Sequence, residues 1–108
     1  MADEFSFSFT AAAENDLDET LTYISKELSA PISANTFLKK LEDRIDLLRK
    51  FPFSCSVVGN PFVKRNDIRK TPVGNFILYY VPDPVGREIV ILRIVYGPRD
   101  RETIEREL

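Results

Sequence analysis

Residues Val73 to Asp100 constrain the fold more than any other stretch, because they have the pattern of a β-hairpin. The two arms, Phe76 to Val81 and Ile89 to Tyr96, are rich in β-branched and aromatic residues, which are enriched in strands. Turn-forming residues separate the arms: Pro82, Asp83, Pro84 and Gly86. Both arms are too apolar for a sheet with one face in water, so we expect them at the centre of a sheet that helices cover on at least one face.

The second arm contains one residue that does not suit a buried strand. Because alternate side chains point to opposite faces, we expect one face to carry Val90, Leu92, Ile94 and Tyr96, and the other to carry Ile89, Ile91, Arg93 and Val95. Burying an unpaired guanidinium in a central strand is costly. The face of Arg93 should therefore either open to solvent or supply a carboxylate partner.

A strand and a helix are predicted before the hairpin. Phe5, Phe7 and Phe9 alternate with polar residues, which is typical of a half-buried strand, and we expect this first strand to lie beside the last one. Thr10 can cap the helix that follows. The apolar face of this helix is formed by residues at helical spacing: Leu17, Leu21, Ile24 and Leu28.

A second helix should follow the break at residues 29–31, with Ser33 as its N-cap and Pro52 as its stop. Its apolar stripe consists of Phe37, Leu38, Leu41, Ile45, Leu48 and Phe51. The short connection predicts an antiparallel helical hairpin that covers the sheet. A further short strand is expected around Asp67 to Thr71, after a stretch without sustained periodicity.

Composition indicates a globular protein of the reducing interior of the cell. The chain of 108 residues, 44% of them hydrophobic, is expected to form one domain over residues 1–108. No apolar run approaches the roughly 20 residues of a transmembrane helix, and the acidic start is unlike a secretory signal. With Cys55 as the single cysteine, no internal disulfide can form. We expect a cytoplasmic protein without membrane contact.

The absence of histidine excludes several kinds of chemistry. It removes the commonest zinc ligand, the commonest general base and every Ser-His-Asp or Cys-His arrangement. Cys55 therefore lacks the usual activating partner. An acidic cluster on the first helix could suggest magnesium, but its members point in different directions, so we interpret it as a solvated face: Glu14, Asp16, Asp18 and Glu19. We expect neither a metal nor another cofactor.

Charge is distributed unevenly along the chain. Residues 1–50 have a net charge of −4, and residues 51–108 have a net charge of +2. An anionic partner should therefore meet the second half. The basic residues there include Lys64, Arg65, Arg69 and Lys70, with Arg99 and Arg101 after the last strand. The cluster before the hairpin is either a solvated strand edge or a phosphate site.

The order and spacing of these motifs resemble the ParE and RelE superfamily of toxins from bacterial type II toxin-antitoxin systems. The features that carry the resemblance are the alternating first strand followed by the segment Ala13 to Glu19, the pair Tyr23-Ile24, the run Leu47 to Pro52, and the segments Val73 to Tyr80 and Ile91 to Asp100. The last two segments look like the hallmark strands of the ParE, or plasmid-stabilisation, branch. The resemblance implies an α+β fold of order β-α-α-β-β-β, with a helical hairpin packed on an antiparallel-type sheet.

The resemblance also implies two different activities. ParE-like toxins are associated with poisoning of DNA gyrase, whereas RelE-like toxins cut messenger RNA on the ribosome with basic residues and a C-terminal tyrosine. Arg69 and Arg99 match basic positions of the RelE-type set. Phe76 stands where that set has an arginine, and the tail after Asp100 has no tyrosine. Lys64, Arg65 or Tyr96 could compensate, but the missing residues favour the ParE branch.

We therefore expect a toxin that inhibits DNA gyrase and that is neutralised in a hetero-oligomer with its cognate antitoxin. The alternatives are a ribosome-dependent endoribonuclease acting on mRNA and a degenerate family member that only binds partners, so enzymatic activity is left open. A disordered antitoxin tail should fold onto apolar surface of the helices and sheet edge. Target-binding residues should converge at the C-terminal end of the last strand: Lys64, Arg65, Arg69, Arg93, Tyr96, Arg99 and Asp100.

Overall fold

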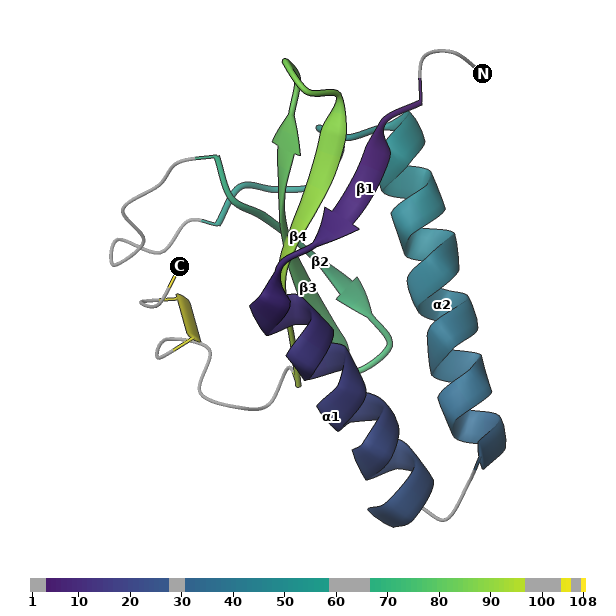
Figure 1. Ribbon diagram of the computed structural model, residues 1–108. Helices are drawn as coiled ribbons and strands as arrows, with labels where there is room; N and C mark the ends of the chain where they lie inside the picture. The colour runs from purple at the N-terminus through teal and green to yellow at the C-terminus, as the bar shows by residue number, and fades with distance from the viewer. Residues whose placement is uncertain (1–3, 28–30, 59–66, 97–103, 106–107) are drawn as a thin grey trace.

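The computed structural model describes residues 4–27, 31–58, 67–96, 104–105 and 108 (Figure 1). Along the chain the elements are β1 (Ser6–Phe9), α1 (Ala11–Glu27), α2 (Pro31–Lys50), β2 (Arg69–Val73), β3 (Phe76–Asp83) and β4 (Glu88–Tyr96). This order confirms the predicted β-α-α-β-β-β arrangement of an α+β fold. Neither helix in the described part of the chain is long and apolar enough to cross a membrane.

The four strands form one sheet in the order β1-β4-β3-β2. β3 pairs with β4 and with β2 in antiparallel orientation, whereas β1 pairs with β4 in parallel orientation, so the sheet is mixed. The predicted hairpin is therefore at the sheet centre, and the first strand does lie beside the last one. α1 and α2 cover the same side of the sheet, and they diverge toward the start of α1 and the end of α2 (Figure 1).

Apolar side chains are buried on both faces of the sheet. On the helix side, residues of both helices pack against the two central strands; the cluster includes Ile24, Phe37, Leu41, Leu48, Leu78, Tyr80 and Ile91. On the opposite side, Tyr79, Val81 and Val95 form a second cluster. Ile104 and Leu108 of the C-terminal segment pack against this second cluster. Burial on both faces explains why the arms of the hairpin are almost continuously apolar.

A β-bulge reverses the side-chain alternation of β4. Tyr79 is paired with Arg93, whereas Tyr80 is paired with Ile91, so Leu92 is an extra residue in β4. Ile94 consequently joins Ile91 in the helix-side cluster, and Leu92 packs in the cluster on the opposite face. The predicted grouping of Ile94 with Leu92 was therefore wrong, because simple alternation does not hold through a bulge.

The start of α1 was predicted correctly, and the start of α2 was not. Thr10 caps α1, since its Oγ1 accepts the backbone N–H of Ala13 at 3.1 Å. α2 begins at Pro31, whose fixed φ suits the first turn of a helix, so Ser33 lies inside the helix and is not its N-cap.

Two further predictions need correction. Phe51, which was assigned to the apolar stripe of α2, lies beyond the end of the helix and is 58% exposed. β2 begins two residues later than the strand expected around Asp67 to Thr71. Leu28, assigned to the apolar face of the first helix, lies outside the described residues.

Candidate functional site

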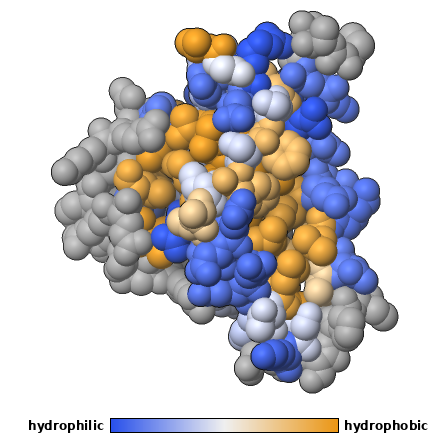
Figure 2. All heavy atoms as spheres, viewed as in Figure 1, coloured by the Kyte–Doolittle hydropathy of each residue, from blue (hydrophilic) through white to orange (hydrophobic). Residues whose placement is uncertain are grey.

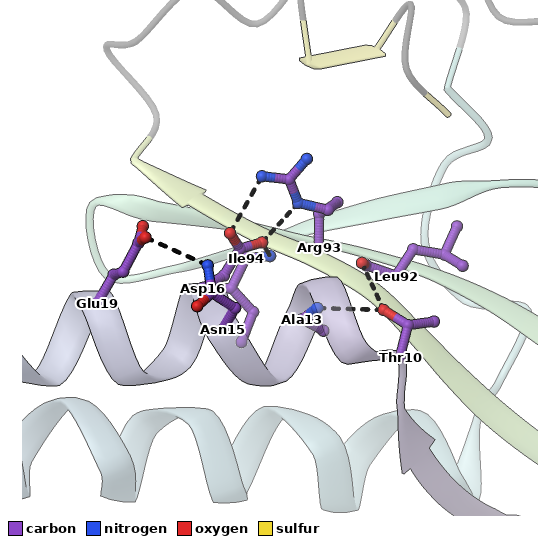
Figure 3. A network of polar contacts seen from close by, with 8 residues as sticks. All are labelled: Thr10, Ala13, Asn15, Asp16, Glu19, Leu92, Arg93 and Ile94. Atoms are coloured by element: carbon purple, nitrogen blue, oxygen red, sulfur yellow. Dashed lines mark hydrogen bonds and ion pairs between the residues drawn. The ribbon is translucent and has the colours of Figure 1, made fainter.

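Arg93 is held by a carboxylate from α1. Its Nε donates to Oδ2 of Asp16 at 2.6 Å, and one Nη donates to Oδ1 at 3.0 Å (Figure 3). This paired geometry is the strongest that an arginine and a carboxylate can form. The side chain of Asp16 is only 8% exposed and that of Arg93 is 22% exposed. Of the two alternatives for Arg93, an open face or a carboxylate partner, the structure shows the carboxylate partner.

Residues at the start of α1 bind the edge of β4 beyond the point where β1 ends. β1 pairs with β4 only as far as Ile91. Beyond that point, the Thr10 hydroxyl donates to the Leu92 carbonyl at 2.9 Å, and Oδ2 of Asp16 accepts the Ile94 N–H at 3.0 Å. Side chains at the start of the helix therefore satisfy backbone groups that a strand would otherwise bind.

This arrangement corrects the interpretation of the acidic cluster as a solvated face. Glu14, Asp18 and Glu19 are exposed, but Asp16 is 7% exposed and packs against the sheet. Among the described residues, no group of three or more potential ligands is arranged to hold a metal ion. The carboxylate of Asp16 is already used by Arg93 and Ile94, so the role of Asp16 is structural.

A cavity of about 400 Å³ lies between α1 and the C-terminal end of β4. Arg93 and Tyr96 both line it, so the structure brings these predicted residues together. Tyr96 is 40% exposed, and its ring meets that of Phe76 edge to face with the centroids 5.4 Å apart. Glu19 and Tyr23 line the cavity from α1.

Arg69 does not lie at this cavity. It is paired with Tyr80, which is paired with Ile91, so Arg69 is level with the middle of β4. Its guanidinium donates to the carbonyls of Cys55 and Phe53, and it lies over the Phe53 ring at 5.3 Å from the centroid. The side chain thus fastens the segment after α2 to β2, and it does not reach the end of β4 where we predicted convergence.

The remaining predicted residues, Lys64, Arg65, Arg99 and Asp100, lie outside the described residues. Their role in target binding stays a prediction. Lys70, the last member of the basic cluster, has its Nζ 3.6 Å from Oε2 of Glu105. The same oxygen accepts a hydrogen bond from the Tyr79 hydroxyl at 2.8 Å, and Glu105 is only 4% exposed. Part of the C-terminal segment is therefore fixed to the sheet by a buried carboxylate.

Cys55 has a more polar environment than its sequence context suggested. Burial alone would raise the pKa of its thiol, but the nearby hydroxyl groups of Tyr80, Thr71 and Ser54 outweigh this effect and the pKa is lowered. Burial is also the main cause of the raised pKa of the Tyr80 phenol. Within the described residues, the buried Tyr80 hydroxyl has no hydrogen bond of normal geometry, although the thiol is its polar neighbour.

An apolar groove opens between α1, α2 and β1, and Figure 2 shows apolar side chains gathered in the gap between the two helices. Phe7 lies in this groove and is 45% exposed, with its ring edge to face against that of Phe9. Charged side chains of α2 form part of the wall. The lining residues are Phe7, Phe9, Leu17, Leu38, Leu41, Glu42, Ile45 and Asp46.

Residues 7–101 match the model of a family described as ParE toxin of type II toxin-antitoxin system, parDE. The chain belongs to the ParE toxin family. This match confirms the resemblance to the ParE and RelE superfamily, and it spans β1 to β4 of the ParE-family fold. No curated protein sequence matches the chain.

Solved structures show the same fold at low sequence identity. The chromosomal ParDE system of P. aeruginosa includes a chain with a TM-score of 0.67 and 20% identity, over 87% of this chain and 97% of that one. A chain of the RelBE2 toxin-antitoxin complex of Mycobacterium tuberculosis gives 0.52 and 21%, over 86% and 98%. The isolated E. coli RelE toxin gives 0.55 and 14%, over 96% and 99%.

Proposed function

We propose that this ParE-family protein is the toxin of a type II toxin-antitoxin pair and that it acts by inhibiting DNA gyrase. The observation that carries the proposal is the match to the ParE toxin family over residues 7–101. Poisoning of gyrase is the activity with which ParE-like toxins are associated. The RelE-type alternative, cleavage of mRNA on the ribosome, shares the fold but needs a particular set of side chains.

The contacts of two positions of the RelE-type set favour the gyrase proposal. Phe76, at the position of an expected arginine, packs its ring against those of Phe37 and Tyr96, with centroids 5.1 Å and 5.4 Å away. Arg69, which does match, donates its guanidinium to backbone carbonyls of the preceding loop. Phe76 carries no charge, and one Nη of Arg69 is bound to backbone carbonyls, so these two positions offer less than the stabilisation of phosphate charge that such cleavage needs from basic side chains.

The apolar groove supports an antitoxin as the partner. Two of the similar structures come from a ParDE system and a RelBE2 toxin-antitoxin complex, so related folds occur in such systems. A groove lined by Phe7, Leu17 and Leu38 suits the apolar face of an amphipathic segment. We infer that a cognate antitoxin places such a segment there, and that toxin and antitoxin form a hetero-oligomer.

Gyrase inhibition is tested with purified proteins. The chain is incubated with gyrase, ATP and supercoiled plasmid, and the reaction is stopped with detergent and protease. We expect linear plasmid from trapped cleavage complexes, in an amount that rises with toxin concentration and requires gyrase. Truncated transcripts in a translation extract, with no linear plasmid, would instead establish the ribonuclease. Neither product would identify a protein that only binds partners.

The target-engaging surface is proposed to include the C-terminal end of β4 and the residues beyond it, with Arg99 as the first to test. Arg99→Ala should abolish toxicity while the free energy of unfolding changes by less than about 1 kcal/mol, the range usual for substitutions outside the core. Toxicity and thermal stability are measured on the same variant. Retained toxicity, or loss of toxicity together with loss of folding, would place the target-engaging surface elsewhere.

A further inference from the structure

In the described part of the chain, the cavity between α1 and the end of β4 combines aromatic rings with an excess of negative charge. Its aromatic lining comes from three separate elements: Tyr23 of α1, Phe76 of β3 and Tyr96 of β4. Tyr23 is 53% exposed and Tyr96 is 40% exposed, so these rings present surface to a ligand. Exposed aromatic rings around a cavity attract cations through their negative faces.

The charges around the cavity also favour a cation. Among the described residues, the charged side chains in its wall are Asp16, Glu19 and Arg93. Asp16 and Arg93 neutralise each other in their paired contact, which leaves the carboxylate of Glu19 as the excess charge. Figure 3 shows Glu19 pointing from α1 to the same side as Asp16. One Oε of Glu19 accepts a hydrogen bond from Asn15 at 3.2 Å, and a carboxylate can accept several more.

An anionic ligand fits the same cavity poorly. Arg93 is its basic residue among the described residues, and both Nε and one Nη of that side chain already bind Asp16. An anion would also meet the carboxylates of Asp16 and Glu19. On the neighbouring surface Asp18 and Lys26 offset each other, so the excess of negative charge remains.

We propose that this cavity receives a positively charged side chain, arginine or lysine, from a partner protein. The cation would stack against Tyr23 and Tyr96 and pair with Glu19. The identity of this partner rests on the proposed function, since an antitoxin is the protein expected to bind this chain. The chemistry of the cavity does not depend on that function, so it can be tested with a peptide alone.

The test is an NMR titration of the full chain with the capped tripeptide Ac-Val-Arg-Val-NH2. The matched probe replaces arginine with citrulline, which has nearly the same shape without the charge. We expect saturable shifts of the ring resonances of Tyr23, Phe76 and Tyr96 with the arginine peptide. Glu19→Gln should weaken its binding about threefold to fivefold, the size of an exposed ion-pair contribution.

Glu14→Gln is the matched control, because it removes an exposed carboxylate from the same helix outside the cavity. Its binding of the arginine peptide should equal that of the unmodified chain. Equal binding of the citrulline peptide, equal losses in the two glutamine variants, or no shift at these rings would overturn the proposal. None of these outcomes bears on whether the protein traps gyrase on DNA.

Discussion

Asp16 of α1 binds Arg93 of β4 through both carboxylate oxygens, although 77 positions separate the two residues in the chain. The Oδ2 atom that binds Arg93 Nε at 2.6 Å also accepts the N–H of Ile94. This contact fixes α1 beside the unpaired edge of β4. It also means that Arg93, which the sequence suggested as a target-binding residue, has a structural partner.

The first prediction concerns this pair. Asp16→Ala leaves the Arg93 guanidinium and the Ile94 N–H without their partner in a largely buried place, so the free energy of unfolding should fall by about 3 kcal/mol. Asp18→Ala removes an exposed carboxylate from the same helix and should cost less than about 0.5 kcal/mol. Urea unfolding of both variants measures the difference. Similar losses in the two variants would mean that the buried pair is not important for stability.

The second prediction concerns the hydroxyl of Thr10, which accepts from Ala13 N–H and donates to the Leu92 carbonyl. Thr10→Val keeps the shape of the side chain but removes both hydrogen bonds, and it should lower the free energy of unfolding by about 1 to 2 kcal/mol. Thr10→Ser keeps the hydroxyl and should differ from the original chain by less than about 0.5 kcal/mol. Thermal unfolding of the two variants distinguishes the effect of losing the hydroxyl from the effect of losing the methyl group. An equal loss of stability in both variants would argue against the capping role.

The fold could be predicted because its patterns are local. The two arms of the hairpin, the alternation of Phe5, Phe7 and Phe9, and the stripe of α2 each depend on residues within one element. The bulge at Leu92 could not be predicted in this way, because it arises from how β4 pairs with Tyr79 and Tyr80. Once one residue is extra, every later side chain in the strand changes face.

The site was harder to predict than the fold, because its contacts join distant elements. The position of Arg93 indicated either an open face or a carboxylate partner, and it did not say which of the several carboxylates of α1 the partner would be. A signal was present: Ala13, Asp16, Thr20 and Ile24 are spaced as one helical face, and all are buried. The contact of Glu105 with Tyr79 had no comparable signal, since the tail around it has no periodic pattern.

The third prediction tests the apolar groove as an antitoxin site. Phe7→Thr keeps a strand-forming residue in β1 but removes a half-exposed ring from the groove. Because truncation of a buried aromatic contact at an interface typically costs more than 1 kcal/mol, the affinity for the antitoxin should fall about tenfold. Val85→Thr is the control, since Val85 is 95% exposed on the turn between β3 and β4.

Calorimetric titration with the cognate antitoxin measures both affinities, after thermal melting has shown that both variants fold. The control should bind as tightly as the unmodified chain. If Phe7→Thr also binds unchanged, the antitoxin uses another surface.

The fourth prediction concerns pH and Cys55. The lowered pKa favours the thiolate in the folded chain, so the midpoint of the rate of alkylation by iodoacetamide should lie at lower pH in buffer than in urea. The linked stability is present above the pKa of the unfolded thiol and is lost as pH falls through the folded pKa. Tyr80→Phe removes a hydroxyl that lowers this pKa and should move the midpoint upward. A midpoint that is the same in buffer and urea would contradict the assigned environment.

The last prediction concerns the attachment of the C-terminal segment. The Tyr79 hydroxyl donates to Oε2 of Glu105 at 2.8 Å, and the carboxylate is buried with Lys70 as a more distant partner at 3.6 Å. Tyr79→Phe leaves this buried carboxylate with one donor fewer, so the free energy of unfolding should fall by about 1 to 3 kcal/mol. Tyr96→Phe makes the same chemical change at a side chain that is 40% exposed, and it should cost less than about 0.5 kcal/mol.

Hydrogen exchange at Ile104 and Glu105 should accelerate only in Tyr79→Phe, because those residues then lose a contact that holds them on the sheet. Unchanged exchange in that variant would show that apolar packing of Ile104 and Leu108 is sufficient to hold the segment.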